Sequence, residues 1–132
     1  MSSSLAHQDE AESARTAVAF KAVVAMANAL DLSWDERCAL LGVPRTTYHR
    51  WLTQGVKALD RDKRDRLAYL LSIYHHAGTA FPGGCGARGW LTRPNSHPAF
   101  GGGTPLQRML RGGMEDLLAV HAVAMAAEAL WS

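Results

Sequence analysis

The sequence has few of the features that mark secreted, membrane-spanning or metal-binding proteins. Only two of its 132 residues are cysteines, Cys38 and Cys85, and they stand in unlike contexts, so neither a disulfide framework nor a zinc-binding cysteine pair is expected. No run approaches the roughly 18 consecutive apolar residues of a membrane-spanning helix. The acidic N-terminal segment lacks the basic n-region of a secretory signal. These absences indicate a cytoplasmic protein without a membrane partner.

Motifs that carry chemistry are absent or out of context. Residues 84–89 satisfy the G-x-G-x-x-G pattern, but a dinucleotide site needs that pattern directly after a strand, and here it follows a helical segment. The Gly-rich run at 101–104 lacks the lysine of a P-loop. No H-x-x-x-H spacing relates the histidines at positions 49, 75, 76, 97 and 121. We expect no catalytic residue, metal or cofactor. A small enzyme or nucleotide-binding protein using the Gly-rich loops is the alternative from another class.

Helical periodicity dominates what is present. Apolar residues make up 48% of the chain, enough for one globular unit, and no strand-like alternation occurs. Residues 1–11 are polar and predict a flexible tail. Helices are expected over about 12–29, from an N-cap at Ser33 to Gly42, over Arg45–Thr53 and over Asp60–His76, followed by a Gly-rich loop at 78–89. The fold class is therefore all-α.

The C-terminal quarter predicts a helical hairpin. Thr104 is a good N-cap and Pro105 suits the first helical position. Gly112-Gly113 then ends that short helix, because glycine adopts a left-handed backbone readily. A second apolar stripe is expected along Met114, Leu117, Leu118, His121, Met125 and Ala129.

Residues 34–52 meet the requirements of a helix-turn-helix. Cys38 is small where the helices approach, Gly42 stands at the turn, and apolar side chains, Val43, Tyr48, Trp51 and Leu52, are expected to face inward. Arg37 departs from the pattern, because an apolar residue is common there. The segment is similar to the helix-turn-helix of the Xre type.

Helical geometry then predicts which residues face DNA. They are the outward residues of the second helix of the motif, Arg45, Thr46, Thr47, His49 and Arg50. Residues 33–69 also carry eight basic and five acidic residues, a bias compatible with phosphate contact as well as with plain solvation. A degenerate motif that serves only dimerisation or packing is the alternative.

The segment 90–120 resembles the toxin-binding domain of the antitoxins Xre, MbcA and ParS. The resemblance rests on the order of a Trp-Leu, a Pro-Asn, a Gly-rich bend, a Thr-Pro-Leu and a Gly-Gly. It implies toxin binding through Trp90, Leu91, Pro94, Asn95, Thr104, Pro105 and Leu106. It divides the chain into the tail, an Xre-like helix-turn-helix bundle at 12–58 and a helical toxin-binding domain at 59–132.

The resemblance also implies a function. The chain would be the non-enzymatic antitoxin of a type II toxin–antitoxin pair. Its partner would be a RES-domain toxin that consumes NAD or transfers ADP-ribose, and the antitoxin would occlude the active site. Operator DNA and a homodimer within the hetero-oligomer are implied as well. The alternative is a stand-alone transcriptional regulator whose C-terminal hairpin only dimerises.

Trp131 and Ser132 end the sequence after the last predicted helix. An aromatic side chain at a chain end is seldom left exposed without cause. One hypothesis places Trp131 and the Ser132 carboxylate at the mouth of the toxin's NAD pocket. The other folds Trp131 onto the last two helices or into a homodimer.

Overall fold

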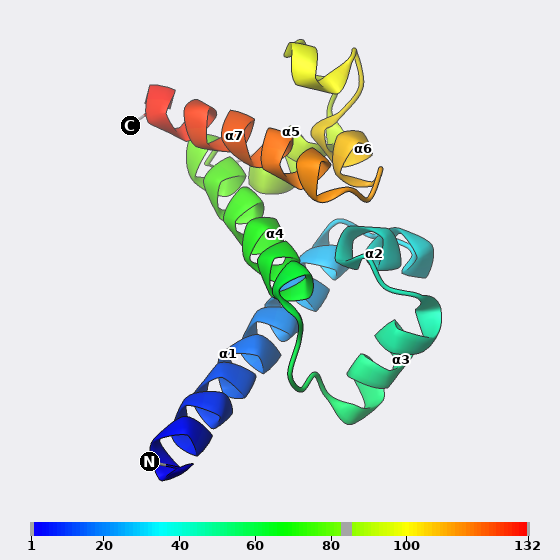
Figure 1. Cartoon of the computed structure of the whole chain (residues 1–132). Coiled ribbons are helices and arrows are strands. Elements are labelled where there is room, and N and C mark those ends of the chain that lie inside the picture. Colours follow the sequence, from blue (N-terminus) through cyan, green and yellow to red (C-terminus); the bar gives the residue numbers. More distant parts are fainter. Residues whose placement is uncertain (1, 83–85, 132) are drawn as a thin grey trace.

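The computed structural model describes residues 2–82 and 86–131, and the side chains of 4–82 and 86–130 (Figure 1). Within these ranges it is all helical, with seven α-helices and no strand, as predicted. The elements are α1 (Ser2–Ala29), α2 (Trp34–Leu41), α3 (Arg45–Gln54), α4 (Arg61–Ala80), α5 (Gly86–Thr92), the 3-10 helix η1 (Pro98–Phe100), α6 (Pro105–Met109) and α7 (Met114–Trp131).

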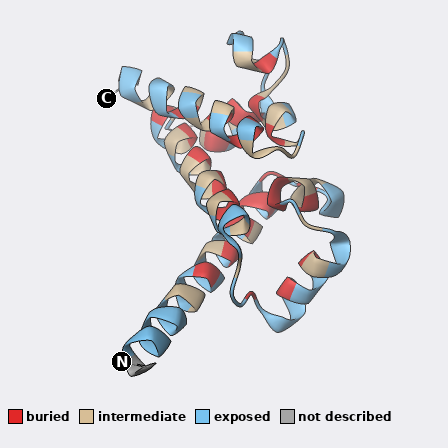
Figure 2. Cartoon of the chain, viewed as in Figure 1, coloured by how far each residue is buried: buried red, intermediate tan, exposed pale blue. Residues whose placement is uncertain are grey.

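Helix α1 begins at Ser2, ten residues before the predicted start. The side chains of residues 4–11 are all exposed, and Figure 2 shows these turns extending beyond the buried part of the molecule. The prediction of a helix start near Glu12 was wrong, because the polar residues before it still have adequate helix propensity. Burial begins at Thr16 and continues through Phe20 and Val23.

Helices α2 and α3 form the predicted helix-turn-helix. Ser33 and Glu36 make a reciprocal capping box at the start of α2, and Gly42 ends it at φ +67°. Tyr48 and Trp51 are buried and meet the edge of Phe20 from α1, with ring centroids 6.0 and 5.5 Å apart.

Leu52 corrects one detail of that prediction. Its side chain is 42% exposed, although we expected it to face inward. Leu52 lies about 100° around the helix from Trp51, and Val56, in the segment after α3, is buried instead.

Helix α4 is the central element of the molecule. It packs against α1, α2, α5 and α7, and its residues Leu70, Ile73 and Ala77 are fully buried. It continues to Ala80, and Gly86–Thr92 forms α5, so the prediction of a loop from 78 to 89 was wrong. Cys85 and its two preceding neighbours lie outside the described residues.

The hairpin α6–α7 is present, but the inward face of α7 differs from the predicted one. Thr104 caps α6 through a capping box with Gln107, and Pro105 occupies the first turn. On α7, Leu117, Val120 and Ala124 are fully buried. The predicted stripe members Leu118 and Met125 are 43% and 47% exposed. Apolar residues occur around most of this helix, so periodicity could not select the side that packs.

Candidate functional site

The recognition helix α3 presents the predicted DNA-facing residues to solvent. Arg45, Thr46, His49 and Arg50 are exposed and Thr47 is half-buried. Arg45 is held by Asp35 of α2, with 2.7 Å between Nε and Oδ1. The hydrogen bond to Asp35 and the charge of that carboxylate raise the pKa of Arg45. Arg45 is thus paired with a carboxylate at the start of α3, and both side chains remain mostly exposed.

Arg37, the departure from the usual motif, is accommodated by hydrogen bonds. Its Nε donates to the Leu32 carbonyl at 2.9 Å, and its Nη1 donates to the Tyr48 hydroxyl at 3.5 Å. Cys38 beside it is buried, and this burial raises the pKa of the thiol. The motif therefore retains its packing with arginine at a position where an apolar residue is common.

Two arginines join the N-terminal helices α1 and α2 to α4 and α5. Arg66 of α4 donates from Nη1 to the Leu40 carbonyl at 3.2 Å, and Arg88 of α5 donates to the Ala29 carbonyl at 3.2 Å. Both acceptors lie in the last turn of a helix, where a cation also interacts favourably with the helix dipole. At Gly42 a Cβ atom would lie 2.9 Å from the end of the Arg66 side chain, which would have to shift, and the positive φ of +67° itself favours glycine there.

Three predicted toxin-binding residues belong to the core. Trp90, Leu91 and Pro105 are buried. Trp90 stacks on Phe81 and meets the edge of Phe100, at centroid distances of 6.4 and 6.1 Å. Buried side chains do not contact a partner directly, so any part these three play in binding is to position other residues.

The remaining motif residues shape a loop between α5 and α6. The Asn95 backbone N–H donates to the Gly103 carbonyl at 3.0 Å, and its side-chain oxygen accepts from the His97 N–H at 2.9 Å. Pro94 is exposed, while Asn95, Thr104 and Leu106 are half-buried. The Pro-Asn turn thus closes the base of a loop over 94–103 whose outer side is open to solvent.

Sequence reasoning missed the buried carboxylate of Asp116. Only 4% of this residue is exposed. Its side chain accepts from Arg108 Nε at 2.6 Å and from the Gly113 N–H at 3.1 Å, and Arg108 also donates to the Ala99 carbonyl at 2.8 Å. The pair therefore joins α6, the start of α7 and the 94–103 loop. In the sequence, Asp116 is only an acidic residue in the first turn of a predicted helix. That pattern does not predict an ion pair with Arg108, eight residues earlier.

The outer face of α7 is apolar. After Glu115, the exposed residues of α7 are Leu118, Ala122, Met125, Ala126, Ala129 and Leu130, and we define its outer face by these six. A soluble helix normally places polar residues on the side away from its core, so a contiguous exposed apolar face indicates an interaction surface. The Trp131 side chain and Ser132 lie outside the described residues, and the hypothesis about them stays untested.

A histidine cluster lies between α4 and α7. His121 Nε2 and Ser72 Oγ are 2.8 Å apart, and the edges of Tyr69 and His76 meet the His121 ring at centroid distances of 5.0 and 5.6 Å. His76 pairs in turn with Glu128. Burial, and then the charge of His76, lower the pKa of His121. No group of three potential metal ligands occurs among the described residues.

The lowered pKa of His121 predicts a loss of stability in mild acid. The unfolded chain binds a proton at His121 more readily than the folded chain does, so stability is expected to fall as the pH drops below about 6.5. His121→Gln is expected to reduce the difference in melting temperature between pH 7.5 and pH 5.5. His7→Gln, in the exposed start of α1, is the control. Equal pH dependence in all three proteins would contradict the assignment to His121.

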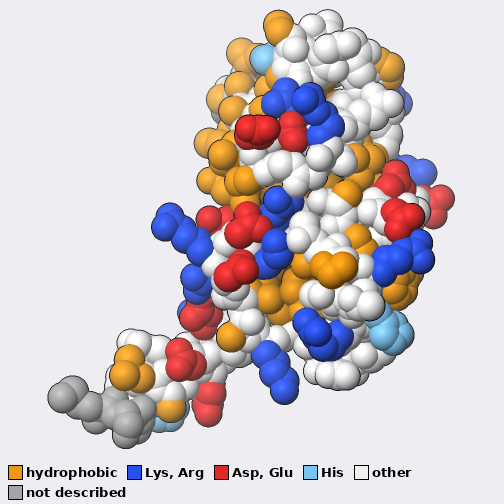
Figure 3. Space-filling model, turned by 45° about the vertical axis from the view of Figure 1, so that its right-hand side comes forward, with side chains coloured by type: hydrophobic (Ala, Val, Ile, Leu, Met, Phe, Trp, Pro, Cys, Tyr) orange, Lys and Arg blue, Asp and Glu red, His pale blue; other side chains and the backbone are white. Residues whose placement is uncertain are grey.

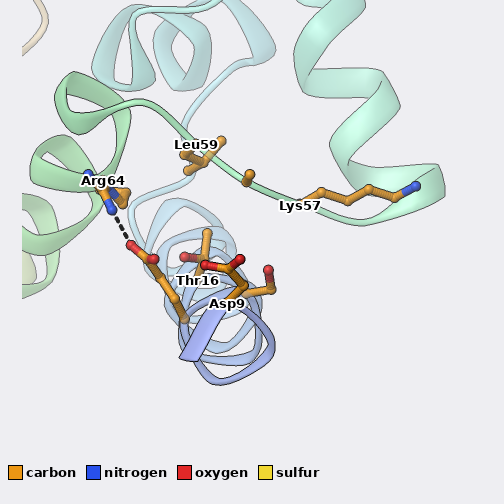
Figure 4. A pocket seen from close by; sticks show the side chains of 8 residues that line it. Asp9, Thr16, Lys57, Leu59 and Arg64 are labelled. Carbon is orange, nitrogen blue, oxygen red and sulfur yellow. Dashed lines mark hydrogen bonds and ion pairs between the residues drawn. The ribbon is translucent and has the colours of Figure 1, made fainter. Parts of the chain in front are cut away.

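A cavity of about 240 Å³ lies between α1 and the segment that joins α3 to α4. Figure 4 shows Arg64 directed towards α1, where it pairs with Glu12, while the Lys57 side chain points away from that pair. Asp9 adds a second carboxylate to the lining. A nucleotide phosphate would meet these carboxylates, so the cavity gives no support to the nucleotide-binding alternative.

Comparison with known families identifies both halves of the chain. Residues 9–72 match the antitoxin Xre-like helix-turn-helix domain, and residues 77–128 match the antitoxin Xre/MbcA/ParS C-terminal toxin-binding domain. The chain therefore belongs to the Xre/MbcA/ParS antitoxins and is not an enzyme. Both matches include part of α4, and the predicted division between residues 58 and 59 stays a prediction.

The chain is also similar to a curated protein. It is 33% identical over 111 residues to the uncharacterized protein y4oB of Sinorhizobium fredii (strain NBRC 101917 / NGR234). The aligned residues make up 83% of this chain and 84% of that protein. Among the described residues, no helix is long and apolar enough to cross a membrane.

Proposed function

We propose that this antitoxin acts in the cytoplasm, where it neutralises a RES-domain toxin by covering the active site of the toxin. Such a toxin consumes NAD or transfers ADP-ribose. The observation that carries the proposal is the match of residues 77–128 to the toxin-binding domain, within which α7 leaves an apolar face exposed. The buried Trp90, Leu91 and Pro105 would hold the 94–103 loop and α7 in position. Pro94, Asn95, Leu106, Trp131 and Ser132 would take part in or border the contact.

The test is co-expression with the protein encoded next to this gene. A RES-domain protein is expected to co-purify with the full chain, and a fragment ending near residue 89 is expected neither to bind it nor to relieve its toxicity. If that fragment neutralises the toxin, the binding half is assigned wrongly. If the full chain binds no such partner, the stand-alone regulator becomes the better explanation.

We further propose that α3 binds the operator of the same operon, and that the protein acts there as a homodimer. Helix-turn-helix proteins read two half-sites through two-fold symmetry. The exposed side chains of α3, Arg50 among them, support this part of the proposal.

Loss of the α3 arginines is expected to weaken operator binding. An Arg50→Ala substitution that removes a bidentate base contact would cost about 1–3 kcal/mol and relax specificity at one position. Arg45 is already paired with Asp35 and must exchange that carboxylate for a phosphate, so Arg45→Ala is expected to weaken binding less than Arg50→Ala and to reduce the salt dependence of binding. Gel-shift titrations on the upstream region at several salt concentrations measure both effects. Unchanged affinity in a chain that carries both Arg45→Ala and Arg50→Ala would indicate a degenerate motif.

A further inference from the structure

Helix α1 has two apolar faces on opposite sides. One is buried against α4 and the helix-turn-helix and contains Phe20, Val23 and Ala27. The opposite face carries five exposed residues, Ala11, Ala14, Val18, Ala22 and Ala25, which we call the outer stripe. A helix that is apolar on both sides is normally covered on both sides, yet Val18 is 70% exposed in the single chain.

The spacing of the outer-stripe residues is the same when counted from either end of the stripe. Successive members are separated by three, four, four and three residues, so the stripe is symmetric about Val18. A two-fold interface uses the same patch on both partners and needs such self-complementarity. In an antiparallel pair centred on Val18, Val18 would meet its own copy and Ala14 would meet Ala22. Alanine at the flanking positions lets two helices approach closely.

A groove beside the stripe provides additional contact area. It has a volume of about 400 Å³ and lies between α1 and α4, where Leu71 adds a larger apolar side chain to Ala14, Val18, Ala19 and Ala22, and Arg15 lines one edge. Five small side chains alone bury little surface compared with the interfaces of stable dimers. With the groove, a second α1 would contact both α1 and α4.

Charges beside the stripe favour the same antiparallel arrangement. Glu10 lies eight residues before Val18 and Lys21 three residues after it, and at 100° per residue both fall on the same flank of α1. Two-fold symmetry places Glu10 of one copy on the same side as Lys21 of the other. Along the helix axis these two residues would be about 7.5 Å apart, which is the rise of five residues. Their long side chains can span that distance.

We propose that the outer stripe of α1 is the surface on which two copies of this chain associate, antiparallel and with the two-fold axis at Val18. The inference rests on the homodimer proposed above and locates it on α1 rather than on the C-terminal hairpin. Figure 3 shows the first turns of α1 projecting from the body of the molecule, where a second copy can reach them. The buried face of α1 contacts Tyr48 and Trp51 of α3, so the two recognition helices would lie away from the interface.

The first test is the mass of the full chain over a range of concentrations, by sedimentation or light scattering. The wild-type chain is expected to dimerise, and Val18→Glu is expected to weaken the dimer at least tenfold, because it buries two carboxylates against each other. Leu118→Glu, on the outer face of α7, is the matched control and is expected to stay dimeric. A monomeric wild-type chain, or a Val18→Glu chain that dimerises normally, would overturn the proposal.

Cysteine cross-linking tests the geometry separately, in a chain whose Cys85 is replaced by serine and whose Cys38 is buried. Val18→Cys is expected to form a disulfide between copies, whereas Ala25→Cys cross-links only with Ala11→Cys. Cross-linking of Ala25→Cys with itself would exclude this register. Val18→Glu is also expected to keep toxin binding in the co-purification assay, so failure of the dimer and failure of the antitoxin function are read independently.

Discussion

Asp116→Ala is expected to lower the free energy of unfolding by about 3 kcal/mol, near the lower end of the range for breaking a buried ion pair. The substitution removes the acceptor of both Arg108 and the Gly113 N–H and leaves the guanidinium without its carboxylate. Arg108 keeps 22% of its side chain in solvent, which limits the cost. Urea denaturation measures the change directly.

The exposed pair of Arg61 and Asp65 is the matched control for Asp116. These residues form an i,i+4 pair on the surface of α4, with 89% and 46% of their side chains exposed. Asp65→Ala is therefore expected to cost about 0.5 kcal/mol or less. If Asp116→Ala is as mild as this control, then the Arg108–Asp116 pair does not hold α6, α7 and the 94–103 loop together.

The ends of α2 and the start and end of α6 could be predicted from the sequence because their causes are local. Ser33 and Thr104 each cap a helix through a partner three residues later. Gly42 and Gly112 adopt positive φ at the turns that follow α2 and α6. All of these signals lie within one helical turn of the residue they specify. Packing partners far along the chain, such as Arg66 with the Leu40 carbonyl, leave no such local trace.

The inward face of α7 could not be predicted for a different reason. Both α7 and α1 carry apolar residues on opposite sides, and on α7 hydrophobic periodicity fits more than one orientation. For α7 the prediction included Leu118 and Met125, whereas the structure buries Val120 and Ala124. The exposed apolar sides of α1 and α7 are the ones that we assign to partners. A helix with apolar residues on two sides therefore indicates a candidate interaction surface.

The exposure of the candidate site residues could be predicted in part, and their roles in binding stay predictions. Outward residues of α3 follow from helix-turn-helix geometry once Tyr48 and Trp51 are buried. The C-terminal motif identified the right segment, but Trp90, Leu91 and Pro105 are residues of the core. Turn and core residues recur in such a motif because they define the local fold, and residues that touch a partner need not be among them.

Leu118→Glu combined with Met125→Glu is expected to abolish neutralisation of the toxin. Both side chains lie on the outer face of α7 and are about half exposed, so the free antitoxin is expected to fold normally, as melting curves would show. In the complex the two carboxylates would be buried without partners. A loss on the order of 3 kcal/mol or more, about 100-fold in affinity, is expected.

The control for this last variant is Leu5→Glu, at a more exposed apolar position on the first turns of α1, which is expected to bind the toxin as the unmodified chain does. Binding is measured by titration of the purified toxin, and neutralisation by the NAD that remains. A double variant that still inhibits the toxin fully would remove the outer face of α7 from the interface. The exposed side of the 94–103 loop would then be the surface of the toxin-binding domain to test next, beginning with Pro94.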